Sequence, residues 1–230
     1  MEEVKIIYED DNFMVLDKPA GMVTTNENSK LKIQTSKLKT QNLEQLSLED
    51  WVKNNRENNL PRQGIVHRLD KGTSGIVIVA KTEESLIDLK RQFKERKVKK
   101  RYMAMVCGNL PFSGEVDMPI ARSKYSFGRF RVDESGKRAQ TIFRLVEKYM
   151  IEGKMYSLVD IDLKTGRTHQ IRVHFSYLGW PLLGDKTYGG LMVGLDRPFL
   201  HAYQTEINGQ VFKSELAPDI KLMLEKYETI

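Results

Sequence analysis

One stretch organises the rest of this chain: His67-Arg68-Leu69-Asp70-Lys71-Gly72-Thr73-Ser74-Gly75, followed at once by Ile76-Val77-Ile78-Val79-Ala80. The apolar run is typical of a buried strand, and the small residues before it allow the chain to turn tightly. Aspartate is rarely buried unless something pairs with it, and Asp70 has Arg68 and Lys71 as close neighbours. Taken alone, such a polar turn is more often structural than catalytic, so its role depends on the rest of the chain.

The composition indicates a water-soluble globular protein. Its 230 residues are 40% hydrophobic and 30% charged, which is ordinary for that class. No apolar run is long enough to cross a bilayer, and the start of the chain does not resemble a secretory signal. The single cysteine, Cys107, lies in an apolar stretch and is expected to be a buried thiol. We therefore expect a cytoplasmic location and no membrane partner.

The net charge of +6 is unevenly distributed along the chain. Basic residues are concentrated in two segments, 90–101 and 122–138. Two such clusters on a small protein favour a polyanionic partner, of which nucleic acid is the commonest. The alternative is that they are two solvated faces without a ligand. The second half of a helix also attracts cations, which explains part of the first cluster.

The pattern of apolar residues predicts an α+β fold, with a large, mostly antiparallel mixed β-sheet flanked by helices, in a single domain over 1–230. Thr168 is expected to be the N-cap of a helix over 169–178, and Asn208-Gly209 predicts a tight hairpin turn. Residues 26–46 are polar and rich in Lys and Gln, which indicates a loop. The expected strands are 4–8, 13–16, 76–80, 101–107, 141–146, 156–163, 199–207 and 210–214; further helices are expected over 47–56, after Thr82 and over 219–227.

Three kinds of chemistry can be weighed from these residues. His169 and His174 are five residues apart, which points them to different faces of a helix, so a metal site is not expected. Ser74 and Ser176 lack the glycine spacing of a nucleophile elbow. A lone carboxylate, Asp70, acting with arginines and an aromatic ring beside a polyanion, suits chemistry at a glycosidic bond.

Seven blocks of the sequence match one known family in the family's order: 17–21, 67–75, 100–108, 136–141, 165–174, 178–190 and 200–202. The chain thereby resembles the RluA family of RNA pseudouridine synthases over nearly its whole length. The resemblance implies a pseudouridine synthase-like catalytic domain. Its activity would be that of an isomerase (an intramolecular transferase) converting uridine to pseudouridine in ribosomal or transfer RNA, with base flipping and with no metal or organic cofactor.

The resemblance also implies roles for individual residues. Asp70 would be the catalytic acid, which either attacks the anomeric carbon or takes a proton from the ribose. Tyr102 would lie against the flipped base, and Arg172 would pair with Asp70 and keep it ionised. Arg68 would fill the space that the departing uridine leaves in the RNA. Four more residues of the matched blocks are expected to contact the substrate: His67, Thr73, Arg167 and His169.

Several alternatives remain open at this stage. Tyr102 could be a core residue of a strand, and Arg172 could lie on the surface of its helix. The chain could be a non-catalytic RNA-binding module on the same scaffold, or a metal-independent glycoside hydrolase in which Asp185 supplies the second carboxylate. Many family members carry a small RNA-binding domain ahead of the catalytic one, whereas this chain begins at the first catalytic strand. We expect a monomer that recognises structured RNA through this domain or through a partner.

Overall fold

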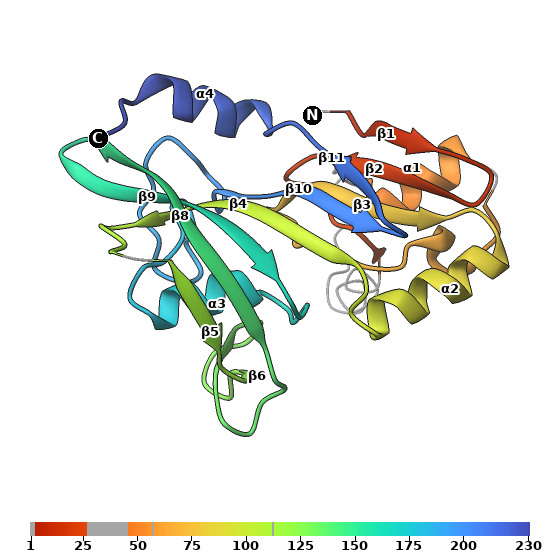
Figure 1. The fold of residues 1–230 in the computed structure, drawn as a ribbon, viewed down its shortest axis with the longest axis horizontal. Coiled ribbons are helices and arrows are strands. Elements are labelled where there is room, and N and C mark those ends of the chain that lie inside the picture. Colours follow the sequence, from red (N-terminus) through yellow and green to blue (C-terminus); the bar gives the residue numbers. More distant parts are fainter. Residues whose placement is uncertain (1–2, 27–45, 57, 112) are drawn as a thin grey trace, which may run out of the picture. The chain divides into compact units, whose positions relative to one another are not determined.

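The computed structural model describes residues 3–26, 46–56, 58–111 and 113–230 (Figure 1). The polar segment predicted to be a loop at 26–46 therefore lies almost entirely outside the described residues. Contacts divide the chain into two compact units, Met1–Glu95 and Arg96–Ile230. The prediction of a single domain over 1–230 stays a prediction, and each unit is described by itself.

The first unit is built on three antiparallel strands in the order β1-β2-β3. The central strand pairs with β3 from Phe13 opposite Ala80 to Lys18 opposite Gly75. Every residue of β3 is buried, as its unbroken apolar sequence predicts. Among its described residues, the elements of this unit are β1 (Lys5–Glu9), β2 (Phe13–Lys18), α1 (Leu48–Asn55), the short η2 (Pro61–Gly64), β3 (Ser74–Ala80) and α2 (Glu83–Lys94).

Both α-helices of the first unit begin at the residue that the sequence predicts. The Ser47 side chain accepts a hydrogen bond from the backbone N–H of Asp50, whose carboxylate accepts one from the backbone N–H of Ser47. Thr82 and Ser85 make the same reciprocal pair at the start of α2. Such capping boxes satisfy backbone donors that the helix itself leaves unpaired, so the helix starts are fixed by local sequence.

The second unit contains an antiparallel sheet in the order β10-β4-β9-β8-β5, with β11 paired to β10. The predicted strands are present, and several are longer than the sequence indicates. Asn208 and Gly209 have φ values of 52° and 76°, as the expected hairpin turn requires. The strands are β4 (Lys99–Cys107), β5 (Gly114–Asp117), β8 (Gln140–Ile151), β9 (Lys154–Leu163), β10 (Leu200–Ile207) and β11 (Gln210–Lys213).

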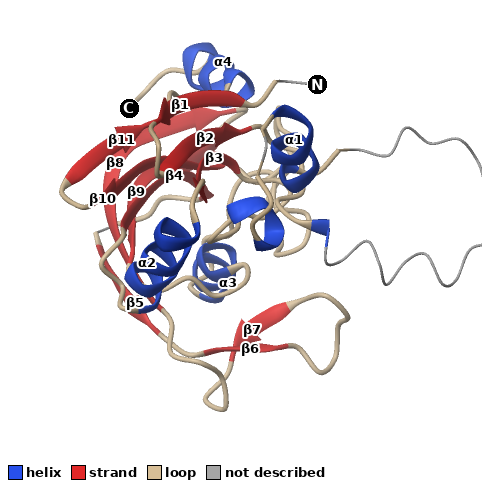
Figure 2. Ribbon diagram, turned by 90° about the vertical axis from the view of Figure 1, so that its right-hand side faces the viewer, coloured by secondary structure: helices blue, strands red, loops and turns tan. Residues whose placement is uncertain are grey.

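Two helices cover the sheet of the second unit on opposite faces (Figure 2). The ring of Phe175 on α3 (Gln170–Tyr177) meets Phe143 of β8 edge-on at 5.2 Å between ring centroids. On the other face, Ile220 and Met223 of α4 (Pro218–Lys226) join a core that includes Met105, Cys107, Tyr156, Leu158 and Phe199. Cys107 is buried there, as predicted, and burial raises the pKa of its thiol.

The helix α3 departs from the prediction at its start. It begins at Gln170, so the residue at the N-cap position is His169 rather than Thr168. His169 has φ 55° and ψ 19°, which is the left-handed conformation, and its side chain makes no capping hydrogen bond. The expectation that Thr168 caps this helix is therefore wrong. At the other end of α3, Gly179 follows the last turn with φ 86°, the left-handed conformation that glycine adopts freely.

A separate two-stranded ribbon stands off the main sheet in the second unit (Figure 2). It consists of β6 (Ile120–Arg122) and β7 (Phe130–Val132), which pair antiparallel. Its base packs on α3 through a small cluster of Ile120, Ala139 and Val173. In the part of the chain that the structure describes, no helix is long and apolar enough to cross a membrane.

Candidate active site

The turn that carries Asp70 is held by hydrogen bonds from both sides. The Thr24 hydroxyl donates to the carbonyl of Leu69 at 2.8 Å and accepts from the N–H of Leu69 at 3.2 Å. The N–H of Gly21 donates to the carbonyl of Lys71 at 2.8 Å, and the N–H of Thr73 to the carbonyl of Asp70 at 3.0 Å. The backbone on either side of Asp70 is thus fixed, and its side chain is half-buried.

A buried lysine, Lys18, shapes the loop that supports this turn. Its side chain has no exposed surface, and its ammonium donates to the carbonyls of Pro19 at 2.9 Å and Met22 at 2.8 Å. Those bonds curl residues 19–22 so that the N–H of Gly21 reaches Lys71. Sequence reasoning noticed the 17–21 block without assigning a task to Lys18. A lysine at the end of an apolar strand, directly before Pro-Ala-Gly, is the signal that could have found it.

The other predicted residues of the first unit differ in their surroundings. Arg68 is exposed, as a residue that enters RNA would need to be, whereas Thr73 is buried. The His67 ring stacks on Phe93 of α2 at 4.6 Å, and its Nε2 accepts a hydrogen bond from the N–H of Ile78 at 3.0 Å. These contacts tie the start of the turn to α2 and β3. The predicted contacts of these residues with substrate stay predictions.

In the second unit, Tyr102 and the helix of Arg172 lie on the same face of the sheet. Tyr102 of β4 stands opposite Ile161 of β9, which stands opposite Phe143 of β8. Directly paired residues of neighbouring strands share a face, and Phe143 contacts α3. Tyr102 is 6% exposed and Arg172 is 8% exposed, so the arginine is buried rather than on the helix surface.

The structure gives Arg172 a carboxylate partner that the sequence did not indicate. Its Nε donates to Oδ2 of Asp185 at 2.7 Å, and its Nη2 donates to Oδ1 at 2.8 Å. The guanidinium also lies 4.9 Å from the centre of the Tyr188 ring. Asp185 accepts further bonds from the N–H groups of Thr187 and Tyr188 at 3.1 and 3.2 Å. Arg172 is thereby held in one orientation, with a fixed positive charge.

Tyr188 links this pair to the rest of the second unit. Its hydroxyl lies 2.8 Å from Nδ1 of His169 and accepts a hydrogen bond from the N–H of Phe130 in β7 at 3.0 Å. Buried hydrogen bonds to Thr141 of β8 hold the side of α3 that faces this strand. Gln170 donates to the Thr141 hydroxyl at 2.9 Å, and Nδ1 of His174 lies 2.9 Å from the same hydroxyl. His174 is therefore a structural histidine whose pKa is lowered, chiefly by burial.

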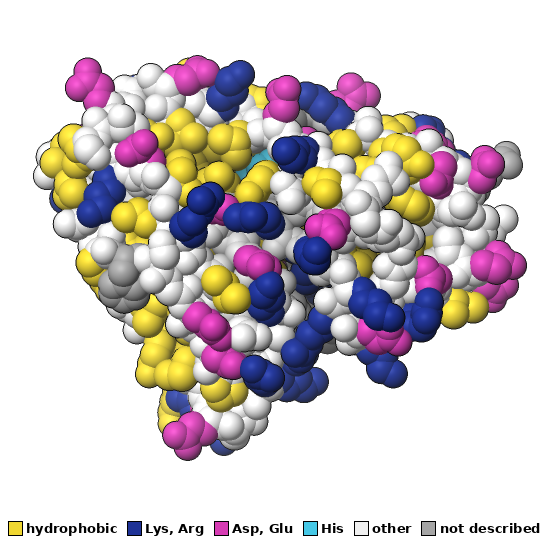
Figure 3. All heavy atoms as spheres, in the orientation of Figure 1, with side chains coloured by type: hydrophobic (Ala, Val, Ile, Leu, Met, Phe, Trp, Pro, Cys, Tyr) yellow, Lys and Arg dark blue, Asp and Glu magenta, His cyan; other side chains and the backbone are white. Residues whose placement is uncertain are grey.

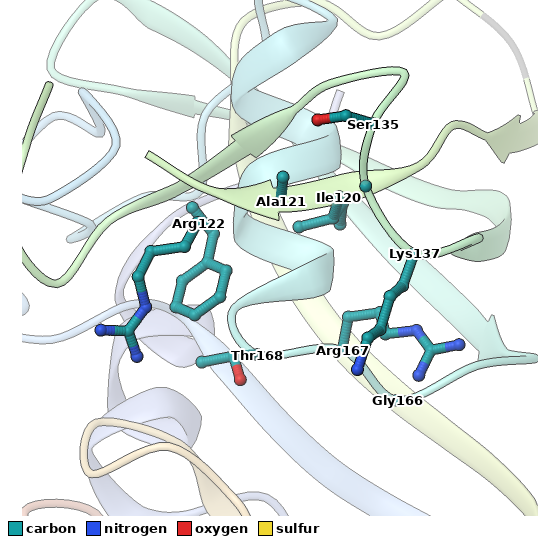
Figure 4. Close-up of a pocket in the computed structure, with 10 residues that line it drawn as sticks. Ile120, Ala121, Arg122, Ser135, Lys137, Gly166, Arg167 and Thr168 are labelled. Carbon is teal, nitrogen blue, oxygen red and sulfur yellow. The ribbon is translucent and has the colours of Figure 1, made fainter. Parts of the chain in front are cut away.

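A cavity of about 410 Å³ opens beside the β6–β7 ribbon (Figure 4). Arg122 lies on one side of the opening, Lys137 and Arg167 lie on the other, and Thr168 lies between them. Cations on both rims with a hydroxyl between them suit an anion such as a phosphate. The lining residues are Ile120, Ala121, Arg122, Phe130, Ser135, Gly136, Lys137, Gly166, Arg167 and Thr168. Of the predicted substrate contacts, Arg167 lies in this cavity.

Lys100, whose ammonium lies near Gly166 of the cavity, loses its proton more readily than an ordinary lysine. Its Nζ lies 3.6 Å from the position that a Cβ on Gly166 would occupy. Burial lowers the pKa of Lys100 to about 8, and the neighbouring Asp162 only partly opposes this effect. In the sequence, Lys100 belongs to a basic cluster and to the matched block 100–108, and neither gives it a task of its own. Its charge disappears at a pH where surface lysines are still protonated.

The predicted site residues fall into both units. Asp70, Arg68, His67 and Thr73 belong to the first, and Tyr102, Arg172, Arg167 and His169 belong to the second. That they converge on one substrate stays a prediction. Within the described ranges, no three His, Cys, Asp or Glu side chains gather as they would around a metal ion.

Comparison with known proteins identifies relatives of one kind. A family model described as RNA pseudouridylate synthase matches residues 12–177. The chain is 39% identical to "Ribosomal large subunit pseudouridine synthase D" of Nitrosomonas europaea, over 96% of this chain and 64% of that protein. It is also 39% identical to the protein of the same name from Borreliella burgdorferi, over 89% of this chain and 61% of that one. The chain thus spans less than two thirds of the length of these relatives.

Solved structures lead to the same group of proteins. The structure of "Human RNA Pseudouridylate Synthase Domain Containing 1" matches with a TM-score of 0.76 and 25% identity, over 100% of this chain and 89% of that chain. "Human RNA Pseudouridylate Synthase Domain Containing 4" matches with a TM-score of 0.70 and 21% identity, over 97% and 93%, which shows a shared fold. The expected α+β fold class and the resemblance noted in the sequence are both confirmed.

Proposed function

This chain belongs to the RNA pseudouridylate synthase family, and we propose that it isomerises uridine to pseudouridine in RNA, with Asp70 as the catalytic residue. The observation that carries the proposal is the braced turn around Asp70, in which a half-buried carboxylate stands on backbone fixed through Leu69 and Lys71. Fixed geometry of this kind is what a reacting group needs. Ribosomal RNA is the favoured substrate class, because the relatives from Nitrosomonas and Borreliella are named for the large ribosomal subunit.

The reaction exchanges one bond of uracil for another. The bond between C1′ of the ribose and N1 of uracil breaks, the base turns, and a bond forms between C1′ and C5. The proton that C5 loses is balanced by the proton that N1 gains. Asp70 would begin this sequence, either by attacking C1′ or by taking a proton from the ribose. Tyr102 would support the detached base with its buried ring.

Arg172 would pair with the Asp70 carboxylate and orient it for the reaction. A guanidinium has five N–H donors, so it can serve two carboxylates at once. Asp185 and the Tyr188 ring hold Arg172 in the interior of the second unit, where a cation acts on a neighbouring acid without being screened by water. We propose that Asp185 anchors Arg172, and that the anchored guanidinium acts on Asp70 during the reaction.

The substrate would be held by contacts to its phosphates and by extrusion of the target base. Chemistry on a base within structured RNA requires the base to leave the stack. Exposed Arg68, two residues before Asp70, would occupy the vacated space. The cationic cavity lined by Arg122, Lys137 and Arg167 would bind the backbone. A cytoplasmic location and a monomeric state stay predictions.

Release of tritium from RNA labelled at C5 of uridine tests this function, because the hydrogen at C5 is lost only when the new bond forms. Asp70→Asn is expected to reduce the release at least about 1,000-fold while RNA binding survives. Asp11→Asn, which alters an exposed acid of the same unit, is the matched control and is expected to behave as the unaltered protein. Normal turnover by Asp70→Asn would contradict the assignment.

The same assay tests the first alternative, and the contacts of Asp185 bear on the second. RNA binding without tritium release by the unaltered protein would favour a non-catalytic RNA-binding module. A glycoside hydrolase would need Asp185 as a proton donor or nucleophile. Its carboxylate instead accepts hydrogen bonds from Arg172, Thr187 and Tyr188, which makes it a structural acceptor.

A further inference from the structure

The tip of the β6–β7 ribbon, residues 123–129, presents two aromatic rings to solvent. The side chain of Tyr125 is 83% exposed and that of Phe127 is fully exposed. Large aromatic side chains normally bury most of their surface on folding. Two of them at the end of a ribbon that stands off the main sheet are therefore available to a ligand (Figure 2).

The tip is also strongly basic. No acidic residue occurs between Asp117 and Asp133, whereas Arg122, Lys124, Arg129 and Arg131 all lie in that interval. Figure 3 shows Lys and Arg side chains on the lower part of the second unit, where Figure 1 places β5 and β6, interspersed with acidic and hydrophobic ones. A partner that fits this surface carries negative charge.

Arginine and aromatic side chains alternate along the ribbon. The guanidinium of Arg131 lies 5.2 Å from the centre of the Tyr125 ring, and that of Arg122 lies 5.6 Å from the centre of the Phe130 ring. Arg131 also pairs with Asp133, which orients it. Flat cations and rings of this kind form the surfaces on which unpaired bases of nucleic acid stack.

We propose that residues 123–129 form a recognition arm that binds unpaired bases of the RNA outside the target uridine. Bases stack on Tyr125 and Phe127, and Lys124 and Arg129 contact the adjoining phosphates. The inference rests on the proposed function for the identity of the substrate as RNA. It adds the chemical class that the arm selects, which is single-stranded or looped RNA rather than regular duplex. A fully paired helix keeps its bases stacked on one another and offers none to the rings.

A protein partner fits these observations less well. An apolar docking surface needs a contiguous patch of several hundred Å², and the two rings are interspersed with cations. Stacking on bases needs only the flat faces of the rings and tolerates water at their edges.

The test compares the unaltered protein with the double variant Tyr125→Ala/Phe127→Ala. Binding is measured by fluorescence anisotropy on two labelled RNAs of equal length, a stem with an unpaired loop and a fully paired duplex. We expect the double variant to lose at least about 10-fold in affinity for the looped RNA and little for the duplex. Tyr125→Phe/Phe127→Tyr, which keeps both rings, is expected to retain the affinity. Leu222→Ala, at another exposed apolar residue of the second unit, is the control.

The outcomes separate this inference from the proposed function. If the double alanine variant keeps its full affinity for looped RNA, the proposed role of residues 123–129 in binding unpaired bases is wrong, even if the protein isomerises uridine normally. An equal loss on looped RNA and on duplex would overturn its selectivity for unpaired bases. If the unaltered protein releases no tritium, the isomerase proposal fails. The binding comparison still shows whether residues 123–129 bind unpaired bases. Loss of a co-purifying protein without loss of RNA affinity would assign the tip to a protein partner instead.

Discussion

Inside the second unit, the guanidinium of Arg172 donates two hydrogen bonds to the carboxylate of Asp185, from Nε to Oδ2 at 2.7 Å and from Nη2 to Oδ1 at 2.8 Å. The side chains are 9% and 1% exposed. Removing one partner of such a pair leaves a buried charge without compensation, which costs more than the pair itself contributes.

Asp185→Asn is therefore expected to lower the free energy of unfolding by about 3–5 kcal/mol. Asp117 provides a matched control on the exposed surface. Its carboxylate also accepts two hydrogen bonds from one guanidinium, that of Arg138, at 2.7 and 3.2 Å. Asp117→Asn is expected to cost much less than Asp185→Asn, because water screens an ion pair on the exposed surface. Urea denaturation of both variants checks the prediction, and equal losses would show that burial does not decide the effect.

Thr24→Val is expected to loosen the turn around Asp70. The hydroxyl of Thr24 makes two hydrogen bonds to the backbone of Leu69, and valine makes neither while keeping nearly the same shape. We expect a loss of about 1–3 kcal/mol in stability and of about 10- to 100-fold in kcat, with KM changed little. Thr24→Ser keeps the hydroxyl and should restore most of kcat. A Thr24→Val protein with full kcat would show that this bracing is not needed for turnover.

Gly190→Ala is expected to break the loop that holds Asp185. The loop closes on itself, because the N–H of Gly190 donates to the carbonyl of Asp185 at 2.9 Å. A Cβ on Gly190 would lie 1.8 Å from the carbonyl oxygen of Leu182, so backbone must move. Gly179→Ala, where a Cβ meets nothing within 4 Å and only the φ of 86° is strained, should cost about 1–2 kcal/mol. Thermal unfolding should place Gly190→Ala well below Gly179→Ala, and the reverse order would contradict the contact.

Acid is expected to weaken the second unit through His201. This side chain is fully buried, and burial, assisted by the nearby Arg197, lowers its pKa to about 4. The unfolded histidine has a pKa near 6.5, so between pH 6.5 and 4 the unfolded chain binds a proton that the folded chain does not. Stability therefore falls as the pH falls, by about 2 kcal/mol between pH 6.5 and 5. Urea denaturation at those two values, with His201→Gln as the variant that lacks the group, checks the effect; identical curves for the unaltered protein would contradict it.

Much of the secondary structure follows from local sequence. The capping boxes at Ser47 and Thr82, the apolar run of β3 and the turn at Asn208-Gly209 are each specified by neighbours in the chain, and the structure confirms them. The start of α3 was predicted wrongly, because the left-handed conformation of His169 has no local signal in the sequence. Threonine is a common N-cap, and only tertiary contacts place the helix start one residue later.

The site was predictable only as a set of residues. The matched blocks contain Arg172 and Asp185 but do not indicate that they pair. The two residues are thirteen positions apart in the chain, and only the packing of the unit brings them together. The supporting tasks of Lys18 and Thr24 have the same origin, because each acts on backbone carbonyls or N–H groups that every residue possesses. Backbone donors and acceptors leave no mark in the sequence, so only the unusual position of Lys18, before Pro-Ala-Gly, gives a hint of such a task.

The left-handed backbone of His169 lowers the stability of the folded protein. A side chain with φ 55° costs about 1–2 kcal/mol relative to glycine, which adopts that conformation freely. The chain therefore keeps an imidazole, 2.8 Å from the Tyr188 hydroxyl, in a backbone conformation that glycine adopts more readily. Glycine at this position would relieve the backbone strain but would lose the hydrogen bond to Tyr188 and the contacts of the ring with Phe130 and Tyr188. A thermostable form of this protein should be sought by changes elsewhere in the chain.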